Sequence, residues 1–326
     1  MAQPPTATNK HPQAAAHCAH DARDDDETAA LMAEVRRLRM CALRRVDDLF
    51  AGEYHSAFKG HGIEFDEVRA YQPGDEVRSI DWNVTARAGR PFVKRFREER
   101  QLTVQLVVDA SASGVWGSGR RTTQRLLAEA CAVLGLAAQR NNDRAALTLF
   151  SDELLLRLPP ARGATHQLRL LRELLGARPA GAGRAMGEAL EKTARGLKRR
   201  SIVFLASDFL LPEIDTALPE LVSTLRLARR RHELVALRAT DPRQTDLPSV
   251  GLIELQDPET GRLVRVDSSS RRVRRRWADS QRAHAERVAK ALRESGCDLV
   301  ELSTEREPAD DLARYFRMRE RRGARR

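Results

Sequence analysis

The sequence predicts an α/β fold: an open, doubly wound, mostly parallel sheet. Short aliphatic and β-branched runs alternate with longer amphipathic stretches, and each short run is almost continuously apolar. Such runs are typical of strands that helices cover on both faces. We expect strands at residues 102–108, 145–150, 201–206, 233–238 and 298–302, and helices at 120–140, 165–176, 186–199, 215–230 and 270–295.

Residues 251–267 interrupt this alternation. Two strand-like runs flank a Pro-Glu-Thr-Gly turn, which predicts an antiparallel hairpin at an edge of the sheet.

The segments outside this α/β pattern predict the other parts of the domain organisation. Residues 1–26 contain almost no large apolar side chains and are expected to form a disordered tail. Residues 27–54 carry one apolar stripe and are expected to form a lead-in helix. A small β-rich subdomain is expected at 55–99, the α/β domain at 100–305, and a C-terminal helix (about 310–319) with a basic tail at 306–326.

Composition limits the classes of protein to which this chain could belong. The chain has 326 residues, 41% of them apolar, and a net charge of +11 from 57 basic and 46 acidic residues. A basic surface favours an acidic partner. The large number of acidic residues is also consistent with a solvated surface on which most basic residues are ion-paired. No apolar run is long enough to cross a bilayer, the start lacks the pattern of a signal peptide, and the four cysteines show no paired spacing. We therefore expect a soluble, cytoplasmic protein.

Two acidic loops follow predicted strands. Asp109, Ser111 and Ser113 leave the first strand of the sheet, and Asp208 follows the strand at 201–206. Loops at the carboxyl ends of parallel strands meet at one edge, and carboxylate and hydroxyl oxygens suit hard cations such as Mg²⁺ or Mn²⁺.

These residues resemble the metal-ion-dependent adhesion site of von Willebrand factor A domains. That site combines D-x-S-x-S, a threonine from a middle loop and a later aspartate. The resemblance implies that Asp109, Ser111, Ser113 and Asp208 match four of the five positions, whereas Arg184 stands where the threonine is expected. A guanidinium there would repel a cation, so a metal-free cluster of Arg184 with Asp109 or Asp208 is the competing expectation.

A second string is more specific. "EFDEVRAYQPGDEVRSIDWNVTAR", residues 64–87, closely resembles the signature of the bacterial family called domain of unknown function 58, and the resemblance extends over roughly residues 40–320. In that family the signature precedes a von Willebrand factor A-like domain. The resemblance implies association with a MoxR-type AAA+ ATPase, a role in assembling or remodelling protein or metal-containing complexes, and no established catalytic activity.

The signature residues suit a structural or docking role. A Pro-Gly turn is flanked by charges of alternating sign, which at cross-strand positions fix register, and Trp82 is expected in a small apolar layer. An acid or base role for Asp75 or Asp81 lacks a well-placed nucleophile. The candidate signature residues are Glu64, Phe65, Arg69, Tyr71, Gly74, Asp75, Arg78, Asp81, Trp82 and Arg87.

We therefore expect a non-enzymatic, protein-binding adaptor whose edge loops, with Arg184 facing the ligand, engage the ATPase or an unknown client. Two alternatives remain open. A nucleic-acid-binding protein would use the arginines at 271–276 and 319–326. A metal-dependent hydrolase would use Asp109 and Asp208, although such sites usually employ more carboxylates.

Overall fold

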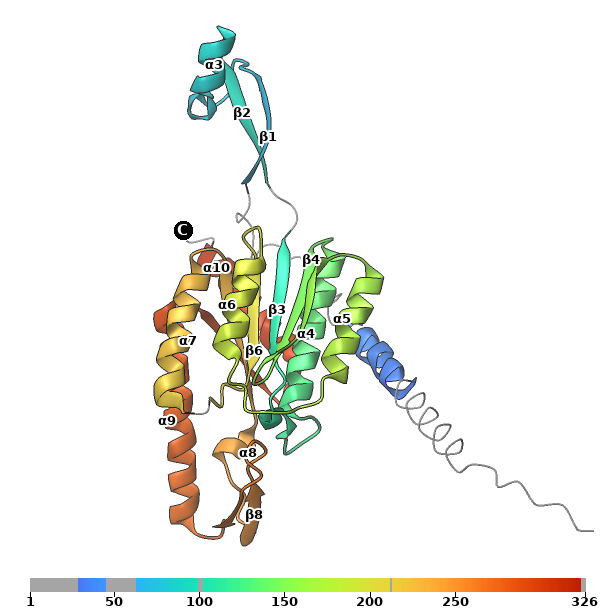
Figure 1. Ribbon diagram of the computed structural model, residues 1–326, viewed down its shortest axis with the longest axis vertical. Helices are drawn as coiled ribbons and strands as arrows, with labels where there is room; N and C mark the ends of the chain where they lie inside the picture. The colour runs from blue at the N-terminus through green and yellow to red at the C-terminus, as the bar shows by residue number, and fades with distance from the viewer. Residues whose placement is uncertain (1–28, 45–62, 99–101, 212, 324–326) are drawn as a thin grey trace, which may run out of the picture.

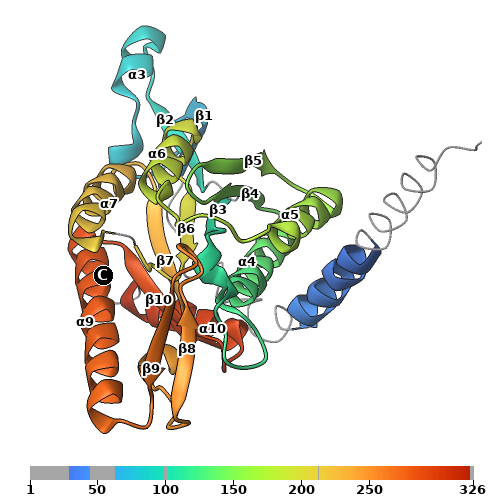
Figure 2. The same ribbon diagram turned by 60° about the horizontal axis from the view of Figure 1, so that its bottom comes forward.

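The computed structural model describes residues 29–44, 63–98, 102–211 and 213–323. The predicted tail at 1–26 lies outside the described residues. Six strands form the main sheet in the order β10-β7-β6-β3-β4-β5 (Figures 1 and 2), with β5 antiparallel to β4 and every other neighbour parallel. The strands are β3 (Thr103–Asp109), β4 (Arg144–Phe150), β5 (Leu154–Ala161), β6 (Ile202–Ser207), β7 (Glu233–Thr240) and β10 (Asp298–Ser303).

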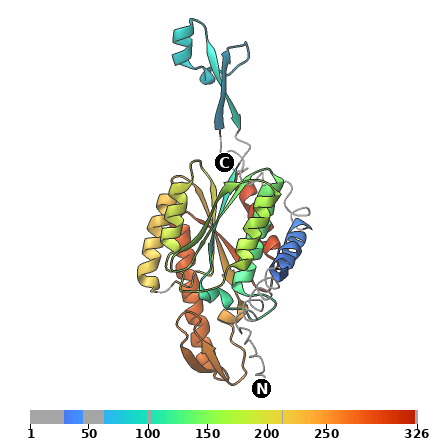
Figure 3. The same cartoon turned by 45° about the vertical axis from the view of Figure 1, so that its right-hand side comes forward.

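Helices cover both faces of this sheet (Figure 3), which confirms the predicted doubly wound α/β fold. Successive strand side chains point to opposite faces, so Leu106 packs in the core beneath α4 while Val107 packs in the core beneath α6. One face carries α4 (Thr123–Arg140), α5 (Ala164–Gly176) and α10 (Pro308–Gly323); the other carries α6 (Met186–Gly196), α7 (Ile214–Arg229) and α9 (Arg271–Ser295). None of the helices in the described ranges is long and apolar enough to cross a membrane.

The order of the strands reverses at β3. The chain passes from β3 to its neighbour β4, and later returns to place β6 on the other side of β3. In open α/β sheets, ligands bind outside the carboxyl ends of the strands at such a reversal. The topology therefore directs attention to the ends of β3 and β6.

The prediction missed one strand and misplaced another pair. β5 was not predicted; it contains Pro159 and Pro160, which a sheet tolerates only at an edge, where β5 lies. The hairpin of β8 (Leu252–Gln256) and β9 (Leu263–Asp267) is antiparallel as expected, but the expected place at an edge of the main sheet is wrong. The hairpin is a two-stranded sheet of its own, entered through the short helix α8 (Pro242–Thr245).

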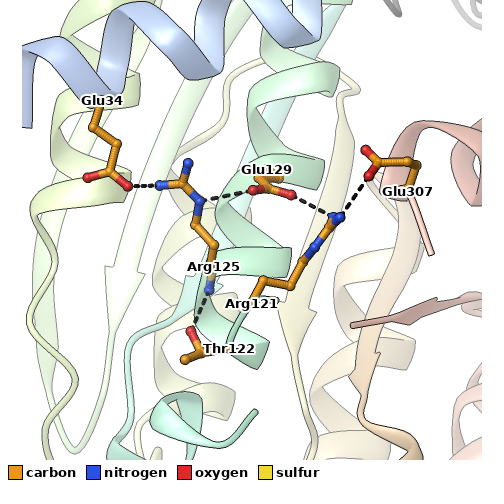
Figure 4. A network of polar contacts seen from close by, with 6 residues as sticks. All are labelled: Glu34, Arg121, Thr122, Arg125, Glu129 and Glu307. Atoms are coloured by element: carbon orange, nitrogen blue, oxygen red, sulfur yellow. Dashed lines mark hydrogen bonds and ion pairs between the residues drawn. The ribbon is translucent and has the colours of Figure 1, made fainter. Parts of the chain in front are cut away.

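The described part of the predicted lead-in helix covers residues 29–44. Its Val35 and Leu38 are buried against Ala132 and Leu171 of α4 and α5. Ion pairs bordering this contact link three elements (Figure 4): Arg125 binds Glu34 and Glu129, and Arg121 lies 2.7 Å from both Glu129 and Glu307. The helix at 29–44 is thus joined to α4, and α4 to the start of α10.

The signature segment forms a separate small unit. Strands β1 (Ile63–Ala70) and β2 (Phe92–Glu98) pair antiparallel, with a 3-10 turn (Val77–Ser79) and helix α3 (Trp82–Ala88) between them. The backbone register places Glu64 opposite Arg97 and Glu67 opposite Arg95. The helix was not predicted. Figure 1 shows this unit beyond the amino-terminal end of β3, away from the carboxyl ends of the strands.

Candidate functional site

Asp109 is the last residue of β3 and is only 8% exposed. Both of its oxygens accept hydrogen bonds: Oδ1 from the Ser111 backbone N–H at 2.9 Å, and Oδ2 from the Ser207 hydroxyl at 2.7 Å. The hydroxyls of Ser111 and Ser113 lie 2.9 Å apart, and both residues are buried. The structure therefore brings the three residues of the D-x-S-x-S string together.

Asp208 follows β6 and reaches the same place. Its Oδ1 accepts the Leu210 backbone N–H at 3.0 Å; burial raises the pKa of Asp208, and this hydrogen bond and the nearby Ser113 hydroxyl offset only part of the rise. Its Oδ2 is buried and has no hydrogen-bond partner. A buried carboxylate oxygen without a partner is costly. All four residues predicted for the site thus converge, and one of their oxygens is unsatisfied.

Burial and mutual repulsion shape the titration of this pair. Burial first, and then the neighbouring charge of Asp208, raise the pKa of Asp109 to about 6. Burial likewise raises the pKa of Asp208. Both carboxyls therefore favour the protonated form unless a nearby positive charge compensates the ionised one.

Arg184 does not supply that charge. Its side chain is 66% exposed, and its guanidinium lies 3.9 Å from Asp152, a residue in the turn after β4. The expected alternative, a cluster of Arg184 with Asp109 or Asp208, is wrong. Asp152 also accepts the backbone N–H groups of Ala182 and Arg184, so it holds the loop and turns the guanidinium outward.

Gly183 explains how that loop approaches the site. Its φ is +69°, and a Cβ at this position would lie 3.3 Å from Oδ2 of Asp109. Glycine adopts positive φ without the cost that other residues pay, and its missing side chain allows the backbone to pass close to the carboxylate.

The turn after Asp208 is held in an uncommon conformation. Phe209 has φ +57°, in the left-handed region, which is rare for a bulky side chain. Its ring is fully buried, its N–H donates to the Ser207 hydroxyl, and its carbonyl lies 2.9 Å from Nε2 of His284 on α9. Such conformations persist only where surrounding contacts hold them, and they gather at functional sites.

Sequence reasoning missed residues that belong to this edge. Ser207 escaped attention although it directly precedes Asp208, and Asp241 although it follows strand β7. Asp241 is 2% exposed and accepts hydrogen bonds from Ser118, Arg243 and Thr304, which lower its pKa. It therefore ties the loop after β3 to the ends of β7 and β10. The position of an acid directly after a buried strand was the available signal.

The residues at this edge fit a hard cation. Two carboxylates and two hydroxyls converge, and the unpartnered Oδ2 of Asp208 is the type of oxygen that Mg²⁺ or Mn²⁺ binds. In the described ranges, no group of three or more His, Cys, Asp or Glu side chains could hold a metal ion. A cation here would therefore depend on serine hydroxyls in addition to the two aspartates.

The signature residues lie beyond the opposite end of the sheet from this edge (Figure 1), and some of them bond to one another. Arg69 binds both oxygens of Asp75 at 2.8 and 2.6 Å, and Gly74 has φ +108° in the turn beside them. Asp81 is 8% exposed and caps α3. The expectation that Trp82 lies in an apolar layer is wrong, because its side chain is 67% exposed.

Of the other signature residues, Arg78 and Arg87 are exposed and Tyr71 is half-buried; for Glu64 and Phe65 only the backbone is described.

The arginine run at 271–276 begins α9. Arg274 donates to the carbonyls of Ser268 and Ser269 and so closes the turn after the hairpin, which gives part of the run a structural role.

Solved structures similar to this chain include two bacterial proteins. An aerotolerance-related membrane protein from Bacteroides fragilis has a TM-score of 0.44 and 12% identity, over 68% of this chain and 99% of that one. A von Willebrand factor type A protein from Catenulispora acidiphila has a TM-score of 0.37 and 11% identity, over 70% of this chain and 44% of that one.

Sequence comparison is more informative. Uncharacterized proteins of Mycobacterium bovis and Mycobacterium tuberculosis are each 34% identical to this chain over 304 residues, which is 93% of this chain and 93% of theirs. Residues 67–287 match the family described as "Protein of unknown function DUF58". The matched segment contains most of the signature string together with Asp109, Ser111, Ser113, Arg184 and Asp208. The chain therefore belongs to this family, as its signature string had indicated.

Proposed function

We propose that this chain is a non-enzymatic, protein-binding adaptor whose ligand-binding edge is formed by Asp109, Ser111, Ser113 and Asp208. The observation that carries the proposal is the unpartnered, buried Oδ2 of Asp208 at the point where the strand order reverses. Two carboxyls and two hydroxyls that converge at this edge supply the oxygen ligands that a hard cation binds.

The four residues would together hold Mg²⁺ or Mn²⁺. When bound, the ion supplies a positive charge that a carboxylate of a partner protein can approach. Asp109 and Ser207 fix the position of the loop after β3 in either case, because their hydrogen bond does not involve Oδ2 of Asp208. Arg184, turned outward at the rim, is available to the same acidic partner.

The partner in this proposal is a MoxR-type AAA+ ATPase, which the family resemblance implies. Co-expression of the full chain with a MoxR-type ATPase of the same genome is the test. We expect the two proteins to co-purify with Mg²⁺ present, and Asp109→Ala to raise the Kd of the complex at least about tenfold, which corresponds to about 1.4 kcal/mol.

Asp279→Ala is the matched control, because Asp279 is an exposed carboxylate on α9. Calorimetric titration of both variants with Mg²⁺ and Mn²⁺ separates loss of the ion from loss of the partner. Intact co-purification of a folded Asp109→Ala variant would contradict the proposal.

A further inference from the structure

A cavity adjoins the candidate cation site. It has a volume of about 440 Å³ and lies between the β8–β9 hairpin, α9 and the loop after β6, and Ser113 forms part of its wall. Figure 2 shows the hairpin beside α9, and Figure 1 shows both at the end of the molecule where β3 ends. Large apolar side chains in its wall are Leu210, Leu255, Val264, Val266 and Trp277.

The hairpin turns one apolar face toward this cavity. The register pairs Leu255 with Val264, so these side chains share a face, and both line the cavity. The rest of the protein does not close over that face, since Val264 remains 45% exposed. A pocket for a small molecule buries most of its ligand, whereas this open wall suits a side chain of a segment that lies across it.

The charge of the cavity is opposite in sign to the charge of the chain, which is +11 overall. Asp257 and Glu259, in the turn of the hairpin, line the cavity, whereas no lysine or arginine of the described ranges does. Arg265 of the hairpin is paired with Glu254, and the register places both on the opposite face of the hairpin. The cavity is therefore an acidic and apolar recess on a basic protein.

The Glu259 carboxylate has no counter-charge. It is half-buried and makes no hydrogen bond or ion pair with the residues that the structure describes. Burial, and then the charges of Asp257, Asp208 and Asp109, raise its pKa to about 7. Hydrogen bonds, above all from the Thr260 hydroxyl, lower the pKa of Asp257 and keep it ionised. A positive charge at this end would pair with Glu259 and relieve the repulsion among the carboxylates.

We infer that this cavity receives a segment of a partner protein in which lysine or arginine neighbours a large apolar residue. The apolar side chain packs on Leu255 and Val264, and the basic side chain pairs with Glu259 and Asp257. Neither carboxylate belongs to the four residues proposed to hold a cation. The inference therefore goes beyond the adaptor proposal and does not require the ion.

Capped, fluorescein-labelled tetrapeptides of the form Gly-X-Z-Gly test this with the full chain, first in a chelator and then with Mg²⁺. X is alanine or tryptophan, and Z is lysine, glutamine or glutamate. Fluorescence anisotropy should show Gly-Trp-Lys-Gly binding at least about tenfold more tightly than Gly-Trp-Gln-Gly and Gly-Ala-Lys-Gly under both conditions. The net charge of +11 attracts the glutamate peptides at long range, so non-specific electrostatics cannot produce a preference for lysine.

Glu259→Gln should reduce the preference for lysine over glutamine at least about fivefold and leave the preference for tryptophan over alanine. Glu254→Gln is the matched control, because Glu254 lies on the same hairpin and does not line the cavity.

Val264→Ser should have the reverse effect: the preference for tryptophan falls about threefold or more, and the preference for lysine remains. Its control is Leu263→Ser, because Leu263 is the adjacent residue, is 60% exposed and does not line the cavity.

Equal affinity for the lysine and glutamine peptides, or a lysine preference unchanged in a folded Glu259→Gln variant, would overturn the inference while the adaptor proposal stands. Self-association of the wild type that Glu259→Gln abolishes would assign the cavity to a second copy of the chain, which also overturns it. Failure of Asp109→Ala to weaken the complex with the ATPase would count against the adaptor proposal alone.

Discussion

At the scale of single residues, the candidate site places two buried carboxyl groups close together, and their hydrogen bonds satisfy only some of their oxygens. Asp109 satisfies both of its oxygens through Ser111 and Ser207, whereas Asp208 leaves one oxygen unsatisfied. Two buried carboxyls near one another cannot both ionise without cost. The same arrangement that weakens the cation-free protein therefore prepares the edge for a positive charge.

The stability of the cation-free protein should depend on pH through this pair. Since the folded pKa of Asp109 is raised from 3.8 to about 6, the folded state binds the proton more tightly than the unfolded state does. The contribution of Asp109 to the free energy of unfolding should therefore be greatest below about pH 4, fall as the pH rises to about 6, and then level off. Asp208, whose pKa is also raised, acts in the same direction.

Asp109→Asn should remove the part of this dependence that Asp109 contributes and stabilise the cation-free protein at neutral pH by up to about 3 kcal/mol. Urea unfolding in a chelator at a series of pH values measures this. Asp279→Asn, at an exposed position, should follow the wild-type curve. A variant curve parallel to that of wild type would show that Asp109 is not the titrating group.

At the scale of elements, local chemistry determines where helices begin. Helix α3 starts at Trp82 because Asp81, in extended conformation, accepts the backbone N–H groups of Asn83 and Val84; it ends at Gly89, whose φ of +69° caps it. Both signals are present in the sequence, within the string "IDWNVTARAG". The alternation of charge around the turn suggested strands throughout, and so the helix was missed.

Asp81→Ala should destabilise α3 by about 1 kcal/mol, since two N–H groups at its start lose their acceptor. Hydrogen exchange of residues 82–88 should accelerate about fivefold, while exchange in the six-stranded sheet stays unchanged. Asp81→Asn, which retains an accepting oxygen, should behave almost as wild type. Equal acceleration in both variants would show that the charge, and not the cap, holds the helix.

At the scale of the whole molecule, the helix at 29–44 extends the core beyond the α/β domain. It contributes Val35 and Leu38 to a cluster with Ala132 and Leu171, and the ion pairs of Arg125 lie at its border. Partly exposed ion pairs contribute little to stability, so the buried apolar contact should dominate.

Val35→Ala should therefore lower the free energy of unfolding by about 2 kcal/mol, because Val35 is fully buried and its removal leaves a cavity. Met40→Ala, at a side chain of the same helix that is 56% exposed, should change it by no more than about 0.5 kcal/mol. Denaturant unfolding of the full chain compares the two. A Val35→Ala variant as stable as wild type would mean that this helix does not unfold together with the sheet.

The sequence by itself determined the family, the doubly wound sheet and the convergence of Asp109, Ser111, Ser113 and Asp208. Nearly continuous apolar runs and the acids that end them are local signals, and parallel strands bring such ends to one edge whatever else the chain does. Only the tertiary structure decided that Arg184 turns to Asp152, that the β8–β9 hairpin stands apart from the main sheet, and that it joins Trp116 and Trp277 around a cavity beside Ser113. Each of these outcomes depends on which segments, distant in sequence, come into contact in the folded protein. The spacing of residues along the chain does not show those contacts.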